Sequence, residues 1–347
     1  MYNNTFYCSN IKHNLSWKVD GSVQPCNQIT NFPKFYSVEN LRSSPEYYKL
    51  SNGTTEYCMR CLDKESINLN SKRLNDNQTH SVYVKLHTDY LKVDGAIGSV
   101  CNAGCRICGS HSSSFWQNED RKFNKTVPIS DTRSTIWSEI EKYKDNILQL
   151  DLGGGEPWLN ELDQQEALLE YWIQTDRAKL IKLRYNTNAS LYPSRLLDKF
   201  QHFREIRITL SLDDTGDRFQ YNRYPLQWDN VMDNIRKLQN LPGVKIDINF
   251  TVSVFTFLYA DTFIDCVKDI GGVNFNVLTD PSIYSIKSMP LKVKEHINPN
   301  NKFFNLIATS PVDNWYTNFS QLTEKLDKQR NQTFEKIFPE LNSIINL

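Results

Sequence analysis

The stretch LKVDGAIGSVCNAGCRICG, residues 91–109, joins an apolar run rich in β-branched residues to three closely spaced cysteines. A run of this composition predicts a β-strand. Cys101, Cys105 and Cys108 follow it with the spacing CxxxCxxC, so one loop presents three thiols. Three thiolates can bind a metal centre and leave one coordination position open for a further ligand. The stretch therefore predicts a strand that leads into an open metal site.

Further runs of the same kind follow, separated by segments with hydrophobic residues at helical spacing. The six predicted strands are residues 91–100, 147–152, 181–185, 206–212, 244–252 and 273–278. The first intervening helix is predicted after a cap at Ser130 and Asp131. Strands and helices in alternation predict a parallel sheet with right-handed crossovers. The fold class is therefore α/β, with a partial, six-stranded (β/α) barrel of the TIM type.

Two segments flank this predicted barrel domain of residues 85–280. Residues 1–84 are polar, rich in Asn and Ser, and hold four cysteines without clear periodicity. That composition predicts a small module that needs a metal to fold. Residues 281–347 are mixed in character, and we expect them to close the barrel. The sequence thus predicts three parts: a cysteine-rich module, a barrel and a C-terminal flank.

Three local predictions concern packing. Residues 318–341 have the pattern of one amphipathic helix that ends near Pro339. Cys266 lies in the apolar stripe of a helix predicted over residues 263–270, and we interpret it as a buried packing residue. The run SSSFW at residues 112–116 predicts a helix cap followed by a packed tryptophan.

The composition excludes several classes of protein. Forty Lys and Arg balance forty Asp and Glu, so no net charge attracts nucleic acid or an anionic membrane over long range. No run of about 18 apolar residues spans a bilayer. The polar start lacks the pattern of a secretory signal, and we expect a cytoplasmic protein. In a reducing compartment the eight cysteines are better explained as metal ligands than as disulfides.

Two motifs of the chain, in the order in which they occur, resemble those of the radical S-adenosylmethionine (radical SAM) superfamily. The first is CxxxCxxC, and the second is GGEP at residues 154–157, directly after the second predicted strand. The resemblance implies that Cys101, Cys105 and Cys108 hold a 4Fe-4S cluster whose fourth iron binds SAM. It also implies that Gly154, Gly155 and Glu156 bind the amino group of SAM. Glycines allow close backbone approach, and a carboxylate suits an ammonium group.

The resemblance extends to further expected SAM contacts. It places Asn188 in the SAM pocket, Ser211 and Asp213 near the ribose hydroxyls, and Arg223 on the SAM carboxylate, which a guanidinium binds bidentately. Ile107 stands where the family often has an aromatic residue, and we expect it to cover the adenine by apolar contact. Plainer explanations stay open: turn residues that bond their own backbone, and a surface arginine.

The remaining cysteine group has the pattern C-x12-G-x4-C followed by CxxC. Its members are Cys8, Cys26, Cys58 and Cys61. The pattern resembles the twitch domain, a shortened relative of the SPASM domain, which carries an auxiliary 4Fe-4S cluster. In most members that domain follows the barrel, whereas here it precedes it. The alternative is a structural zinc site with the same four ligands.

The resemblance implies an enzyme that cleaves SAM reductively to a 5′-deoxyadenosyl radical, which abstracts hydrogen from a substrate. With an auxiliary cluster for electron transfer, oxidation of a small polyol, cyclitol or sugar-like substrate is expected. The alternative within the family is modification of a peptide or protein. A flavodoxin or ferredoxin is the expected reductant. A non-catalytic zinc-binding protein is the alternative from another class, and the sequence identifies no catalytic base.

Overall fold

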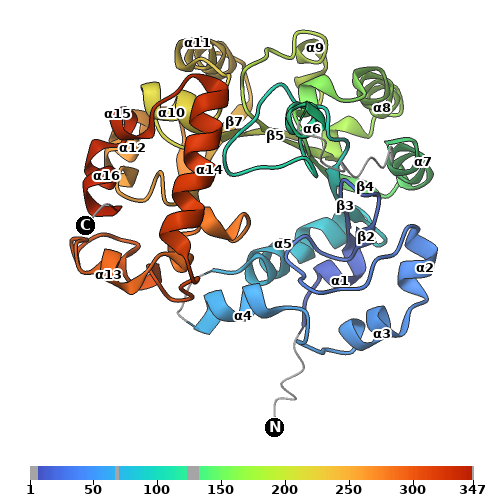
Figure 1. Cartoon of the computed structure of the whole chain (residues 1–347). Helices are drawn as coiled ribbons and strands as arrows, with labels where there is room; N and C mark the ends of the chain where they lie inside the picture. The colour runs from blue at the N-terminus through green and yellow to red at the C-terminus, as the bar shows by residue number, and fades with distance from the viewer. Residues whose placement is uncertain (1–6, 67–69, 123–132, 346–347) are drawn as a thin grey trace. The chain divides into compact units, whose positions relative to one another are not determined.

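The computed structural model describes residues 7–66, 70–122 and 133–345 (Figure 1). Within these ranges an eight-stranded sheet has the order β2-β1-β3-β4-β5-β6-β7-β8. The strands are β1 Asn14–Trp17, β2 Val23–Gln24, β3 Leu91–Ala96, β4 Ile147–Gly153, β5 Lys182–Thr187, β6 Glu205–Ser211, β7 Val244–Val252 and β8 Gly272–Val277. The α/β class is confirmed, and all six predicted strands are present as β3 to β8, adjacent in chain order.

The pairing is mostly parallel. Parallel partners are β1 with β3, β3 with β4, β4 with β5, and β7 with β8, whereas β2 runs antiparallel to β1. The sheet therefore has two strands more than the sequence predicted. Both come from the N-terminal segment, which was expected to lack regular periodicity. Strand β1 has only four residues, Asn-Leu-Ser-Trp, so its alternation of polar and apolar residues is too short to be recognised, and the structure buries the polar as well as the apolar side chains.

Two compact units divide the chain. The first comprises the described residues of Met1–Val100, Pro128–Asn186 and Pro193–Arg207; the second comprises those of Cys101–Val127, Thr187–Tyr192 and Ile208–Leu347. Helices of the first are α1 Asn10–His13, α2 Val38–Arg42, α3 Pro45–Ser51, α4 Met59–Ser66, α5 Lys72–Leu86, α7 Arg133–Tyr143, α8 Leu162–Gln174 and α9 Leu197–Phe200. Helices of the second are α6 Ser114–Lys122, α10 Gly216–Asn222, α11 Trp228–Gln239, α12 Ala260–Val267, α13 Leu291–Lys294, α14 Trp315–Arg330, α15 Phe334–Ile337 and α16 Pro339–Ile345.

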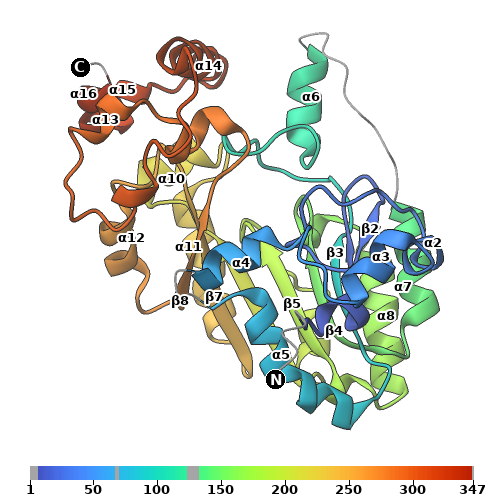
Figure 2. The same cartoon turned by 90° about the horizontal axis from the view of Figure 1, so that it is seen from below.

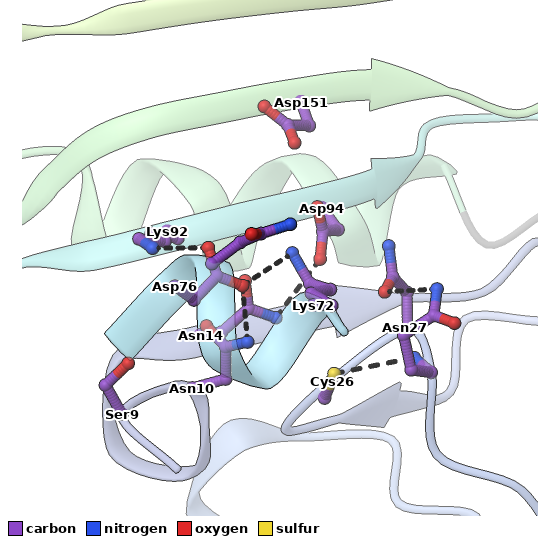
Figure 3. Close-up of polar contacts among 12 residues, drawn as sticks. Ser9, Asn10, Asn14, Cys26, Asn27, Lys72, Asp76, Lys92, Asp94 and Asp151 are labelled. Atoms are coloured by element: carbon purple, nitrogen blue, oxygen red, sulfur yellow. Dashed lines mark hydrogen bonds and ion pairs between the residues drawn. The ribbon is translucent and has the colours of Figure 1, made fainter. Parts of the chain in front are cut away.

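The strands of the first unit have one apolar and one charged face. Val93, Leu150 and Leu183 form a row across β3, β4 and β5, and each is at most 1% exposed. Helices α7 and α8 lie together beside these strands (Figure 2). The neighbouring row, on the opposite face, consists of Asp94, Asp151 and Arg184. Helix α5 crosses in front of β3 on this charged face (Figure 3).

The predicted single helix over residues 318–341 is wrong. Helix α14 ends at Arg330, because Asn331 adopts a left-handed conformation with φ 52°. The backbone oxygen of Asp327 accepts from Gln332 N at 3.0 Å, which closes the helix end. The short helices α15 and α16 follow, and Pro339 begins α16 rather than ending a helix.

The prediction for Cys266 is also wrong, since this residue is exposed. Helix α12 buries Ala260, Phe263 and Val267, and Cys266 points away from that face. The cap predicted at Ser130 and Asp131 lies outside the described residues. Among the helices of the described ranges, none combines the length and apolar character needed to cross a bilayer.

Candidate functional site

The three-cysteine loop lies in the second unit between β3 and α6, and backbone hydrogen bonds hold it to the end of α10. Gly104 N donates to Tyr224 O at 2.7 Å, and Arg106 N donates to Asn222 O at 2.9 Å. Cys105 is buried, whereas Cys101 and Cys108 are partly exposed, and all three are free thiols. The loop is therefore anchored through its backbone, which leaves the thiols available to a metal centre.

Helix α6 fixes the same loop from its other end. Ser113 Oγ accepts a hydrogen bond from Trp116 N at 3.4 Å and donates to Ala103 O at 2.7 Å. Ser114 Oγ accepts from Cys101 N at 3.0 Å. The indole Nε1 of Trp116 donates to Cys105 O at 2.9 Å. The predicted helix cap with a packed tryptophan is confirmed, and both features also order the cysteine loop.

The surroundings of two thiols of this loop, Cys105 and Cys108, favour the neutral form. Burial raises the pKa of Cys105, against the opposing effect of the Arg223 and Arg330 guanidinium groups. Burial also raises the pKa of Cys108, to about 11, with the Cys105 thiol acting in the same direction. A metal would have to displace these protons, so binding of a thiolate-ligated centre releases them.

Arg223 and Asp213, both expected to contact SAM, form an ion pair. Arg223 Nη2 lies 2.6 Å from Asp213 Oδ2, and both side chains are buried. Thr251 N donates to Asp213 Oδ1 at 2.8 Å. Arg223 Nη1 lies 3.8 Å from Cys105 Sγ, while Nε has no hydrogen-bond partner among the described residues. The alternative of a surface arginine is wrong, and one guanidinium connects an acidic side chain to the cysteine loop.

Asn188 is joined to the cysteine loop through Asn102, a residue that the sequence did not single out. Asn188 Nδ2 donates to Asn102 Oδ1 at 3.0 Å, and Asn102 Nδ2 donates to Ser190 Oγ at 2.8 Å. Asn188 Oδ1 also accepts from Ser190 N at 2.9 Å, the local turn bond of the plainer explanation. Ser211, at the end of β6, and Ile107 in the loop are both partly buried.

The GGEP segment lies in the first unit, after β4. Gly154 and Gly155 have φ of 80° and 54°, and a Cβ on Gly155 would lie 2.3 Å from Val100 O. The glycines are thus required by close backbone packing. Glu156 is fully buried; its N donates to Val100 O at 2.8 Å, and its side chain accepts from Trp158 N at 3.2 Å. Glu156 therefore caps the short 3-10 helix Pro157–Leu159.

The four N-terminal cysteines all belong to the first unit, where electrostatic effects link their thiols. Burial raises the pKa of Cys58 to about 11, with Cys8 and Cys61 adding to the effect. Burial likewise raises the pKa of Cys8, assisted by Cys61, and that of Cys26, assisted by Cys8. Such mutual effects require neighbouring thiols. Thiols are the kind of ligand that iron-sulfur clusters and structural zinc use. Within the described ranges, no three His, Cys, Asp or Glu side chains converge on one point closely enough for a single metal ion.

Sequence reasoning missed the role of the Arg106 side chain. The guanidinium lies over the Tyr221 ring, 3.6 Å from its centroid. It forms an ion pair with Asp327 of α14 and donates to Gln332 Oε1 at 3.0 Å. Asp327 lies 221 positions further along the chain. The C-terminal flank therefore contacts Arg106, which lies within the three-cysteine loop.

No protein-family model and no curated protein sequence matches the chain. Among solved structures it is similar to native anSMEcpe with bound AdoMet, with 18% identity, 69% of this chain and 62% of that chain covered, and a TM-score of 0.43. It is also similar to Streptococcus suis SuiB bound to S-adenosylmethionine, with 15% identity, 86% and 66% covered, and a TM-score of 0.38. The chain spans less than two thirds of the length of each. The function proposed for this protein therefore rests on its own residues.

Proposed function

We propose that the protein is a radical SAM enzyme in which Cys101, Cys105 and Cys108 hold a 4Fe-4S cluster. The observation that carries this proposal is the CxxxCxxC loop, which α6 and the end of α10 hold from both sides through backbone hydrogen bonds. Three thiolate ligands from one anchored loop leave a fourth coordination position of the cluster open. When bound, the cluster and SAM supply a 5′-deoxyadenosyl radical that abstracts hydrogen from the substrate.

Arg223 is proposed to bind the SAM carboxylate. Its Nη2 is paired with Asp213 and its Nη1 faces Cys105, whereas Nε has no hydrogen-bond partner within the described residues. A guanidinium presents several donors in one plane, so it can keep Asp213 and still bind a carboxylate. The other proposed SAM contacts are Gly154, Gly155, Glu156, Asn188, Ser211, Asp213 and Ile107. They belong to a partial six-stranded barrel in residues 85–280, closed by residues 281–347.

The N-terminal module of residues 1–84 is proposed to hold an auxiliary 4Fe-4S cluster through Cys8, Cys26, Cys58 and Cys61. The mutual effects of these thiols on their pKa values support a common site. Four thiolates saturate a cluster, so its proposed role is electron transfer rather than substrate binding. We propose a net oxidation of a small polyol or sugar-like substrate, with peptide modification as the alternative, in a cytoplasmic protein reduced by flavodoxin or ferredoxin.

Anaerobic reconstitution tests the proposal. The wild-type chain should bind about eight irons, as two 4Fe-4S clusters require, and absorb broadly near about 400 nm. With SAM and dithionite it should release 5′-deoxyadenosine. Cys105→Ala should lose about half of the iron and this release, whereas the exposed Cys266→Ala should retain both. A colourless protein loaded with zinc would show the non-catalytic alternative. Activity assays of the enzyme with polyol and peptide libraries then distinguish the two substrate classes.

A further inference from the structure

A cavity of about 430 Å³ lies in the first unit, at the starts of β3 and β4. Leu91, the first residue of β3, and Asn146, which directly precedes β4, both line it. Gly154 and Gly155 follow the other end of β4, and β3 runs parallel to β4. The cavity therefore lies at the edge of these strands opposite to the GGEP segment. Its volume is in the range of about 300 to 1,000 Å³ that small-molecule sites have.

Aromatic rings form much of the cavity wall. Tyr90 is fully buried and stacks on His13, with 4.3 Å between the ring centroids and 7° between the planes. His13 Nδ1 lies 3.0 Å from Tyr90 O, and because a carbonyl oxygen only accepts, Nδ1 carries the proton. Tyr47 of α3 and Tyr143 at the end of α7 are half-buried and line the same cavity. Four rings at one cavity favour a ligand with a flat, apolar part.

Lys12 of α1 and Arg42 of α2 supply positive charge to the cavity. Both residues line it and are exposed. The Arg42 guanidinium lies over Tyr143, 5.9 Å from the ring centroid, and its charge opposes the effect of burial, which raises the pKa of Tyr47. Among the residues that the structure describes, neither Lys12 nor Arg42 has an ion-pair partner. The charge of both is therefore available to a ligand.

One carboxylate, that of Asp89, lines the cavity, and the backbone of this residue is held in place. Asp89 O accepts from Asn146 Nδ2 at 3.2 Å, and Asp89 N donates to His87 Nδ1 at 3.2 Å. Leu91 N donates to Asn146 O at 2.7 Å. These hydrogen bonds join the loop before β3 to the residue before β4, so this side of the cavity wall is fixed. The lining thus carries two cations and one anion.

We propose that this cavity binds a small organic anion in which a flat ring carries a phosphate group. The ring packs on the aromatic wall, and the phosphate lies between Lys12 and Arg42. A phosphate monoester carries a charge of about −1.5 to −2 at pH 7, which matches two unpaired cations better than a single carboxylate does. Arg and Lys both bind phosphate, Arg through a planar fork of donors. The site uses no cysteine and no metal, so the proposal goes beyond the radical SAM function and stands without it.

Isothermal titration calorimetry with phenyl phosphate tests the proposal in the full-length chain at about pH 8, where the phosphate is a dianion. Arg42→Met keeps the aliphatic stem but removes the charge, and it should weaken phenyl phosphate binding about tenfold or more. Tyr143→Leu should weaken phenyl phosphate binding but leave the weaker binding of inorganic phosphate unchanged. Lys49→Met is the matched control, since Lys49 is an exposed cation of α3. Tyr47 and Ser51 line the cavity at i and i+4 of this helix, so Lys49, midway between them, faces away.

Saturable binding of phenyl phosphate that falls in Arg42→Met and Tyr143→Leu, but not in Lys49→Met, supports the proposal. Absence of binding to the wild-type chain, or equal affinity in Arg42→Met and the wild type, overturns it. Inorganic phosphate bound as tightly as phenyl phosphate also overturns it, since the rings then contribute nothing. Circular dichroism checks that each variant is folded. If Arg42→Met is not, Lys12→Met replaces it with the same expected loss, because Lys12 is exposed.

Discussion

Replacing Asp327 with asparagine should loosen the cysteine loop of the second unit. Asp327 Oδ1 accepts from the Arg106 guanidinium and from Tyr221 Oη at 2.8 Å, and Oδ2 accepts from Phe334 N at 2.6 Å. Asparagine keeps the volume but leaves the fully buried Arg106 side chain without its counter-charge. Its amide also presents a second donor to Phe334 N or to Arg106. The variant therefore removes one buried ion pair and creates one donor–donor contact.

The expected cost is about 3 kcal/mol of unfolding free energy, the lower end of the range of about 3 to 5 kcal/mol for breaking a buried pair. The lower end applies because Asp327 is 13% exposed and Arg106 keeps Gln332 and the Tyr221 ring. Urea unfolding should show a lower midpoint at an unchanged slope. Alkylation of the buried Cys105 thiol in the metal-free protein should accelerate, by up to about a hundredfold if loop opening limits the reaction.

Asp233→Asn is the matched control. Asp233 forms an ion pair with Arg236 at 2.5 Å, but both side chains are more than 60% exposed. Such a surface pair contributes at most about 0.5 kcal/mol. If Asp327→Asn changes the unfolding free energy and the alkylation rate no more than Asp233→Asn does, Asp327 does not hold the loop, and the reasoning is refuted.

Three more predictions concern other parts of the chain. Gly155→Ala should lower the free energy of unfolding in urea by about 2 to 4 kcal/mol, because the added Cβ would lie 2.3 Å from a backbone oxygen. Gly243→Ala is the control: Gly243 has φ 74° and open space around it, so this variant should lose only about 1 to 2 kcal/mol. Equal losses in the two variants would contradict this. Cys266 should be alkylated quickly in the native protein and Cys105 slowly, and mass spectrometry showing the reverse order would disprove the exposure assigned to each. Burial raises the pKa of Asp94 to about 6, above its unfolded value, so the native state binds more protons than the unfolded state between these two pKa values. The free energy of unfolding of the metal-free protein should therefore fall by up to about 2 to 3 kcal/mol as the pH rises from 4 to 7. Asp94→Asn should lack this contribution to the pH dependence.

The sheet was predictable where the strands are long and apolar. The six runs from residue 91 onward contain enough β-branched and aliphatic residues to identify β3 to β8 and their order. Strand β1 was not predictable, because four residues carry too little pattern, and only its pairing with β2 and β3 defines it. The end of α14 at Arg330 was missed for a similar reason. Its cause is the conformation of Asn331 and a contact to Asp327, neither of which interrupts the hydrophobic spacing.

The sequence by itself determined the grouping of the thiols in the loop of Cys101, Cys105 and Cys108. Their spacing is local, so a single turn of chain brings three sulfur atoms to one loop whatever the rest of the fold does. Only the tertiary structure decided what surrounds them: the Asp327 contact to Arg106, and the Arg223 guanidinium, which is paired with Asp213 and faces Cys105. Asp327 lies 221 positions from Arg106, and Arg223 lies 118 positions from Cys105. Electrostatic and hydrogen-bond energies depend on distance in space, which only folding sets.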